Sequence, residues 1–384
     1  MKDIYDLAII GGGISSCTLI ANIFKNGFKG KIAIVEAGRG LGGRCSSRYS
    51  KRNKKFILDH GAPNLNITNV SRNTKLSNFI YELIDNNLIK EFKNSHVEID
   101  ENYNFSYVTD NRFYEGKVYI PSHSMNLFAE NLVQLNKDNN QVDFYFENLI
   151  TKINFESNLW KITSNKNKKI ISKFLVSSSN LLLHKRSLDI LKVNEIPLKK
   201  ALPVSNKNIN EILTLVNKQE YIKRINFLIY PKFNFNPKRI LDRDNFHIIF
   251  SNKAEKEIGF ERIIFQKQPN NNFAFVIHTK ECEILRNYLI KNDKKFLYDY
   301  LSSNLNKILK INSISDFDLI CEDITIMNWR ASQPIGLKIP KRLQLCKECN
   351  IAFCGDWFDF EGFGTIQGAI LSALELSEKI NNLI

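Results

Sequence analysis

The residues up to Glu36 contain the pattern that most restricts the possible folds of this chain. Ile4–Ile10 is a short apolar run, and Gly11-Gly12-Gly13 follows it directly. Apolar residues then recur with helical spacing up to Gly27, and Lys31–Val35 is a second apolar run. A strand, a tight turn, a helix and a second strand in this order form a βαβ unit, which predicts a parallel sheet covered by helices.

The turn after the first predicted strand has the residue types that bind a dinucleotide. Gly11 permits the tight turn, Gly13 lets a pyrophosphate approach the backbone, and Ser16 stands where the usual fingerprint has a third glycine. The phosphates would lie at the positive end of the helix that follows. Glu36, at the end of the second strand, would accept hydrogen bonds from the adenosine ribose and would repel a 2′-phosphate. The residues predicted to contact the dinucleotide here are Gly11, Gly13, Ile14, Ser15, Ser16 and Glu36.

A second glycine-rich loop follows Glu36 directly. Its sequence, GRGLGGRCSSR at 38–48, contains four glycines that let the backbone run close to a ligand. Arg44 carries a planar guanidinium that can pair with a phosphate through two hydrogen bonds. Nicotinamide-dependent enzymes do not generally need such a loop after the acid, whereas one class of FAD enzymes does. The residues predicted to contact the cofactor from this loop are Ala37, Arg39, Gly43 and Arg44.

Several stretches resemble the flavin amine oxidase superfamily, and its renalase branch in particular. An acid followed by Gly-Gly-Arg is typical of this superfamily, and LDHGAP at 58–63 is similar to its Asp-x-Gly-Ala segment. SMNLFAENL at 124–132 is similar to its Gly-Met-x-x-Leu helix start. FVIHT at 275–279 and WRASQP at 329–334 resemble segments of the renalase branch. FCGDWFDFEGFGTIQGAILSA at 353–373 is similar to the flavin segment in which Gly-Asp and a loop precede a helix.

The resemblance implies both the fold and the cofactor. We expect an α/β chain with a three-layer, Rossmann-type FAD-binding domain, like that of p-hydroxybenzoate hydroxylase, and a discontinuous substrate domain with a mixed sheet. The FAD-binding domain would comprise residues 1–64, 118–184 and 326–384, and the substrate domain residues 65–117 and 185–325. No cysteine lies within 358–368, so the FAD should be bound noncovalently.

The same resemblance implies further FAD contacts. Asp356 would bind hydroxyls of the ribityl chain or near the pyrophosphate. Backbone N–H groups at 366–368 would point at the pyrimidine end of the flavin, where a helix N-terminus favours the negative charge of the reduced form. Taken alone, the pattern at 365–380 favours an ordinary amphipathic core helix that Thr365 could cap, and the first glycine turn could simply end in a helix-capping serine. The residues implied are Gly61, Ala62, Gly355, Asp356, Ile366 and Gly368.

The resemblance also implies a reaction. Renalase-like enzymes take a hydride from a reduced nicotinamide, especially a misreduced dihydro isomer, and pass the electrons to oxygen, giving hydrogen peroxide. We therefore expect a small hydride donor as partner, with NAD(P) as a substrate candidate. Hydride transfer to a flavin needs no strong general base, and the sequence has no evident Ser/His/Asp or paired-carboxylate set. Two alternatives stay open: an amine oxidase or desaturase on the same scaffold, and a flavoprotein without turnover.

Four residues are candidates for the substrate pocket, although the catalytic residues stay unknown: His278, Trp329, Arg330 and Gln333. His278 could hydrogen-bond a substrate amide, or it could be a structural histidine at a strand end. Trp329 and Arg330 either wall the pocket and bind an anionic substrate, or form a packed tryptophan and a salt bridge. Residues 63–65 follow Ala62 where relatives often carry aromatic side chains, and this departure leaves the substrate open.

Charge and cysteine content exclude other classes. The net charge is +14, but the basic runs at 51–55 and 166–169 are short and lack interleaved aromatics, so we expect no nucleic-acid partner. The seven cysteines show no disulfide framework, which indicates a reduced, cytoplasmic protein. Cys346 and Cys349 form a CxxC pair without a second pair or a nearby histidine, so we expect no metal. No apolar stretch approaches the ~20 residues that span a bilayer, so we expect no integral membrane association.

Overall fold

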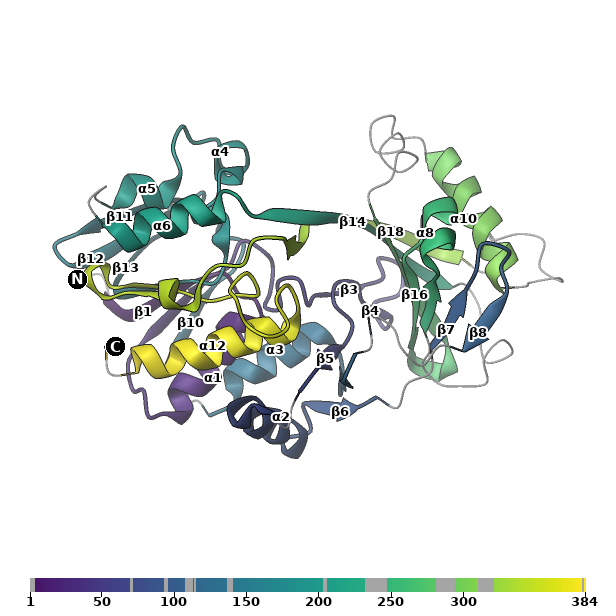
Figure 1. The fold of residues 1–384 in the computed structure, drawn as a ribbon, viewed down its shortest axis with the longest axis horizontal. Helices are drawn as coiled ribbons and strands as arrows, with labels where there is room; N and C mark the ends of the chain where they lie inside the picture. Colours follow the sequence, from purple (N-terminus) through teal and green to yellow (C-terminus); the bar gives the residue numbers. More distant parts are fainter. Residues whose placement is uncertain are drawn as a thin grey trace.

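The computed structural model describes residues 4–69, 72–92, 96–107, 113, 115–136, 141–202, 206–231, 247–280, 294–309, 321–381 and 383–384. These residues form two lobes, which lie side by side in Figure 1, and both chain ends belong to the left lobe. Two long strands, β14 (Glu220–Pro231) and β18 (Cys321–Ile335), run from one lobe into the other.

The first lobe is built on an eight-stranded sheet. Its main order is β10-β2-β1-β13-β12-β11, and β20 pairs with β13 and with β19. The pairs β10–β2, β2–β1, β1–β13 and β13–β20 are parallel, whereas β13–β12 and β12–β11 are antiparallel. The strands are β1 (Ile4–Ile10), β2 (Ile32–Val35), β10 (Val142–Tyr145), β11 (Ile150–Glu156), β12 (Leu159–Ser164), β13 (Lys169–Ser177), β19 (Leu345–Cys346) and β20 (Ile351–Phe353).

Helices cover this sheet, and they explain why β1 and β2 are almost wholly apolar. α1 (Ile14–Lys25) contacts both α3 (Met125–Gln134) and α12 (Ile366–Ile380), and the three lie side by side below the sheet in Figure 1. α4 (Arg186–Leu191), α5 (Pro197–Ala201) and α6 (Lys207–Val216) lie above it in the same view.

The second lobe contains a seven-stranded mixed sheet with the order β18-β14-β17-β16-β15-β7-β8, in which only β15–β7 is parallel among the described pairs. Its remaining strands are β7 (His96–Ile99), β8 (Phe105–Tyr107), β15 (His247–Phe250), β16 (Arg262–Lys267) and β17 (Phe273–Lys280). α8 (Asn252–Ile258) and α10 (Lys294–Leu309) contribute to the hydrophobic core of this lobe.

Smaller elements join the lobes. The strands β3 (Ser47–Tyr49) and β4 (Ile57–Asp59) pair with each other, and β5 (Leu65–Ile67), β9 (Lys117–Pro121) and β6 (Ile89–Glu91) form a three-stranded sheet beside α2 (Thr74–Asp85). Short 3₁₀ turns lie at Asn180–Leu182, Pro269–Asn271, Lys341–Gln344 and Lys347–Cys349.

The predicted fold class is confirmed: a Rossmann-type α/β domain is combined with a mixed-sheet domain assembled from separate segments. The domain boundaries stay a prediction. Residues 65–89 and 186–216, which the sequence analysis assigned to the substrate domain, pack into the hydrophobic core of the first lobe, for example through Leu83 and Ile212.

Candidate functional site

Two adjoining cavities lie where the lobes meet. The turn cavity, of about 500 Å³, lies against the glycine turn after β1, the loop 42–45 and the start of α12. The sheet cavity, of about 420 Å³, lies against β14, β16, β17 and β18 and against residues 61–66. Both cavities are lined by Arg44, Ala62, Trp329, Ser332 and residues 364–366. A ligand in the turn cavity would therefore lie beside a ligand in the sheet cavity.

The backbone after β1 leaves space for a ligand. Gly11 has a φ of +100°, which residues with a side chain rarely adopt, and a Cβ there would lie 2.6 Å from Ser178 Oγ. A Cβ on Gly13 would meet no atom of the described residues within 4 Å, and Gly13, Ile14 and Ser15 line the turn cavity. Gly11 is thus required by the shape of the turn, whereas Gly13 keeps the cavity open.

The second glycine-rich loop lies against the first. Gly42 N–H donates to the Gly12 carbonyl at 2.8 Å, and Gly13 and Gly42 form a parallel β-bridge. A Cβ on Gly43 would lie 3.2 Å from Gly13 Cα, so the missing side chain lets the two backbones touch. Gly43 and Arg44 line the turn cavity. Ala37 and Arg39, which were also predicted as contacts, are exposed and line neither cavity.

Ser16 has a structural position behind the turn. Its Oγ donates to the Gly11 carbonyl at 2.5 Å and lies 2.6 Å from Ser178 Oγ, just after β13. The residue that replaces the third glycine therefore ties the turn to the neighbouring strand. It lines neither cavity.

Glu36 lines the turn cavity and holds both loops. One carboxylate oxygen accepts a hydrogen bond from Gly12 N–H at 2.6 Å, and the other accepts one from Gly38 N–H at 2.5 Å. Because a carboxylate has about four acceptor positions, a ribose hydroxyl can still bind there.

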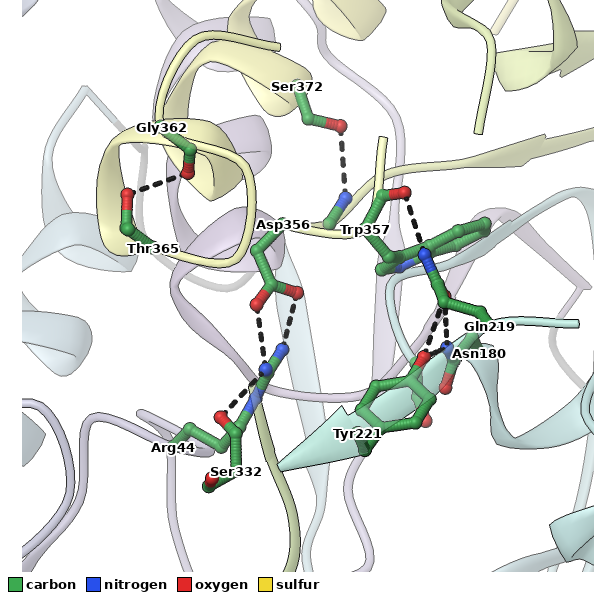
Figure 2. A network of polar contacts seen from close by, with 12 residues as sticks. Arg44, Asn180, Gln219, Tyr221, Ser332, Asp356, Trp357, Gly362, Thr365 and Ser372 are labelled. Atoms are coloured by element: carbon green, nitrogen blue, oxygen red, sulfur yellow. Dashed lines mark hydrogen bonds and ion pairs between the residues drawn. The ribbon is translucent and has the colours of Figure 1, made fainter. Parts of the chain in front are cut away.

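Arg44, which lines both cavities, forms an ion pair with Asp356, which lines the turn cavity (Figure 2). The guanidinium donates to both carboxylate oxygens, at 2.7 and 2.6 Å, and also to the Ser332 carbonyl at 3.2 Å. The Arg44 side chain is 40% exposed and that of Asp356 is 6% exposed. Burial alone would lower the pKa of Arg44, but the neighbouring carboxylate more than offsets this, so the pKa is raised. Arg44, which was predicted to bind a phosphate, and Asp356, which was predicted to bind hydroxyls, are thus bound to each other.

Two glycines allow close backbone packing beside this pair: Gly61 lies against Arg44, and Gly355 directly precedes Asp356. Gly61 lines the sheet cavity, and a Cβ on it would collide with the Arg44 carbonyl. Ala62 N–H donates to that same carbonyl at 3.0 Å, and Ala62 lines both cavities. Gly355 has a φ of +149° and donates its N–H to Ser372 Oγ at 3.0 Å, so it shapes the chain before Asp356 without lining a cavity.

The start of α12 differs in one detail from the prediction. The Thr365 side chain does not cap the helix; its hydroxyl donates to the Gly362 carbonyl at 2.7 Å, within the preceding turn (Figure 2). Ile366 lines both cavities, and its contact to a flavin stays a prediction. Gly368 lines neither, and a Cβ on it would collide with the Gly362 carbonyl.

The turn cavity contains a second cation that no sequence motif predicts. Arg186, at the start of α4, lines this cavity with its guanidinium 4.3 Å above the Tyr221 ring. Arg186 Nη2 donates to Asn180 Oδ1 at 3.0 Å, while its buried Nε has no hydrogen-bond partner among the described residues. Tyr221 donates in turn to Gln219 (Figure 2) at 2.8 Å. No motif identifies Arg186, because the first lobe's packing alone brings α4 to this wall.

Three of the four pocket candidates line the sheet cavity: His278, Trp329 and Gln333. Trp329 also lines the turn cavity, stacks on His60 with ring centroids 5.4 Å apart, and keeps its Nε1 without a hydrogen-bond partner among the described residues. Arg330 is exposed and lines neither cavity.

His278 is buried and uncharged. Burial lowers its pKa well below the ordinary value, and the positive charges of Arg262 and Arg224 lower it further. Arg262 Nε donates to His278 Nδ1 at 3.1 Å. A neutral ring in this cavity is suited to hydrogen bonding rather than to holding an anion.

Metal sites, disulfides and membrane-spanning helices are all absent from the described part of the chain. Its histidines, cysteines and acids form no group that could hold a metal ion. No disulfide joins any two of the six cysteines within it, Cys346 and Cys349 included. None of its helices combines the length and the apolar composition that crossing a membrane requires.

Comparison with known proteins agrees with this architecture. A family model of the NAD(P)-binding Rossmann-like domain matches residues 9–83, which include the glycine turn, Glu36 and Arg44. The chain is similar to the crystal structure of a candidate protoporphyrinogen oxidase from Exiguobacterium sp. 255-15, with 10% sequence identity, a TM-score of 0.62 and 98% of each chain covered. At this identity the likeness shows a shared fold. No curated protein matches the chain.

Proposed function

We propose that this protein is a renalase-like, FAD-dependent oxidoreductase that takes a hydride from a small reduced donor and passes the electrons to oxygen. The donor would be a reduced nicotinamide, a dihydro isomer of NAD(P). The observation that carries the proposal is the pair of adjoining cavities, one at a dinucleotide turn and the other in the second lobe, with one common wall. Hydride transfer requires the flavin and its donor to be in contact, and two adjoining cavities would allow this contact.

The residues of the turn cavity fit FAD. The open space at Gly13 and the helix N-terminus beside it suit a pyrophosphate, and Arg186 supplies positive charge, whereas the charge of Arg44 is offset by Asp356. Glu36 would bind the adenosine ribose, Asp356 the hydroxyls near the flavin, and the backbone at Ile366 the pyrimidine edge. No cysteine precedes α12 in the loop, in agreement with noncovalent binding.

When bound, FAD would supply the hydride acceptor and the route for electrons to oxygen. The protein would orient the donor in the sheet cavity and exclude water from it. Trp329 lines both cavities and would form a flat wall for the donor ring. Asn64, Asn226 and Gln333 place polar groups in the sheet cavity, and these groups would favour a polar donor over the apolar polyene of a desaturase.

The test is the visible spectrum of the purified protein without oxygen, before and after addition of NADH that contains its 2- and 6-dihydro isomers. The proposal predicts flavin bands that bleach rapidly with the isomers and not with pure 4-dihydro NADH. If the bands persist after the isomers are added, the protein still binds FAD, but its donor is not a dihydronicotinamide, and amines would be tested next. A colourless protein that also fails to bind added FAD would overturn the roles given to Arg44 and Asp356.

A further inference from the structure

Three side chains of the sheet cavity lie in one row across the second sheet. Arg262 on β16 is directly opposite His278 on β17, and His278 is directly opposite Asn226 on β14. Directly opposed residues of antiparallel strands point to the same face, with Cβ atoms about 5 Å apart. All three residues line the sheet cavity.

The chemistry of Arg262 fixes the tautomer of His278. A guanidinium only donates hydrogen bonds, so the Nδ1 that receives the Arg262 Nε–H must carry a lone pair. The ring is neutral, and its single proton therefore lies on Nε2. His278 is 2% exposed, and this Nε2–H has no hydrogen-bond partner among the described residues.

The amide orientation of Asn226 is fixed in the same way. Its Nδ2 donates to the His60 carbonyl at 2.5 Å, and a carbonyl only accepts, so the amide cannot be turned around. Asn226 is 2% exposed, and its Oδ1 has no hydrogen-bond partner among the described residues. His278 therefore presents a buried donor and Asn226 a buried acceptor on neighbouring strands.

Two of the cations around this pair are matched by carboxylates. Arg224 forms a two-point ion pair with Glu261, at 2.9 Å for both contacts, and Lys280 is paired with Glu255. Arg262 lies over the Phe113 ring, 4.5 Å from its centroid, in addition to its bond with His278. His278 Nε2–H and Asn226 Oδ1 are thus a neutral donor and acceptor available to a ligand, and Trp329 Nε1 and Asn64 Oδ1 in the same cavity are likewise without partners among the described residues.

We propose that His278 and Asn226 recognise an amide group of the substrate, whose carbonyl accepts from His278 Nε2–H and whose N–H donates to Asn226 Oδ1. Arg262 is the positioning residue that keeps the His278 proton on Nε2. The inference rests on the proposed function only in assigning this amide to the hydride donor, where it would be the carboxamide of the nicotinamide ring.

The experiment measures the dissociation constants of three probes for the FAD-loaded protein by equilibrium dialysis. Nicotinamide has both amide groups, 3-acetylpyridine keeps the carbonyl but lacks the N–H, and nicotinate carries a negative carboxylate. We expect nicotinamide to bind at least tenfold more tightly than either of the others. Equal affinities, or tighter binding of nicotinate, would overturn the inference without any variant.

Single substitutions test which residue binds which part of the amide. Asn226→Leu should abolish the preference for nicotinamide over 3-acetylpyridine, and His278→Phe should weaken both probes to the same degree. Arg262→Met should reduce the preference at least fivefold, while Arg262→Gln, which keeps an N–H donor, should retain it. His247→Phe is the matched control, since His247 is a buried histidine of the same sheet that lines neither cavity. A preference unchanged in both Asn226→Leu and His278→Phe would contradict the assignment.

The two proposals can fail separately. Bleaching by dihydro isomers without any preference for the amide would overturn the role of His278 and Asn226 and leave the proposed function intact. A clear amide preference in a protein whose flavin no dihydronicotinamide reduces would support the amide site and overturn the proposed donor.

Discussion

Gly11 and Gly13 lie two residues apart and lack a side chain for different reasons. Gly11 has a backbone conformation that a Cβ would strain, and that Cβ would also press on Ser178. Gly13 has an ordinary φ of −77° and faces the turn cavity. The same residue type thus serves the stability of the turn at one position and the space for a ligand at the other.

This difference predicts opposite results for two alanine variants. Gly11→Ala should lower the free energy of unfolding of the apoprotein by about 1–3 kcal/mol, because a residue with a side chain is strained at positive φ. Gly13→Ala should leave this free energy within about 0.5 kcal/mol and weaken FAD binding at least ~10-fold, or about 1.4 kcal/mol. Urea unfolding and flavin titration measure the two effects, and a stability loss in Gly13→Ala would contradict the assignment.

Arg186 allows a second prediction at this scale. If its guanidinium binds a phosphate of the cofactor, Arg186→Leu should weaken FAD binding about 10-fold, because a hydrogen bond to a charged group is worth about 1.5–3 kcal/mol. The neighbouring Lys185 is exposed and lines neither cavity, so Lys185→Leu is the matched control. Equal flavin affinity in the two variants would remove Arg186 from the site.

Local spacing predicts the turn and Glu36, and residue chemistry predicts Arg44 in the loop that follows. Asp356, His278 and Trp329 come from distant segments and are predicted only through the family resemblance. Arg186 and Asn226 could not be found in this way, because their partners Tyr221 and His278 come from other segments. Ser16 occupies a motif position but does not line a cavity; its hydroxyl donates to the Gly11 carbonyl and stabilises the turn.

At the scale of elements, the N-terminus of α3 is capped by Asp59, a side chain of strand β4. The side chain of Ser124, which precedes the helix, does not cap it. Instead, Oδ1 of Asp59 at the end of β4 accepts from Met125 N–H at 2.9 Å and from Ser47 Oγ at 2.5 Å, and Ser47 accepts from Asn126 N–H at 3.1 Å. The Asp-x-Gly-Ala segment therefore also fixes the start of α3, which sequence spacing could not reveal.

The Asp59 cap predicts a pH dependence. Burial raises the pKa of Asp59 to about 6, and the hydrogen bonds from Ser47 and Met125 reduce this rise only in part. The folded protein therefore holds the proton more tightly than the unfolded chain, whose pKa is about 3.9, so this residue makes the protein less stable as pH rises from about 4 to about 6. The full effect is at most about 3 kcal/mol.

Asp59→Asn isolates this effect, because asparagine still accepts the two hydrogen bonds but does not titrate in this range. The difference in unfolding free energy between wild type and variant should shift by about 2 kcal/mol against the wild type between pH 4.5 and pH 7. Asp85→Asn, at an exposed aspartate of α2, is the control. A difference that is the same at both pH values would mean that Asp59 titrates normally in the folded protein.

At the scale of the whole molecule, two glutamines join β4 to the second sheet. Gln266 accepts from Asp59 N–H and donates to its carbonyl, both at 2.9 Å, and Gln268 makes the same two contacts with Ile57. Their side chains thus act as a substitute strand for β4. A small core that includes Phe56, Leu58 and Val276 lies beside this contact.

This contact can be tested by Gln266→Leu, which leaves the Asp59 backbone N–H and carbonyl without partners. Each unsatisfied buried group costs about 1–3 kcal/mol, so the free energy of unfolding should fall by at least about 2 kcal/mol. Lys267→Gln, at the exposed position between the two glutamines, should change it by less than about 0.5 kcal/mol. Equal stability of the two variants would show that the glutamine contacts contribute nothing to the union of the lobes.

The walls of the turn cavity leave the ribosome one after another: Gly13 first, then Arg186, and Asp356 only after the second lobe has been made. The βαβ unit around Gly13 can form early, since its contacts are local. The cavity closes only when Arg44 meets Asp356. If FAD is the ligand, as proposed, it would therefore bind the finished chain rather than the growing one.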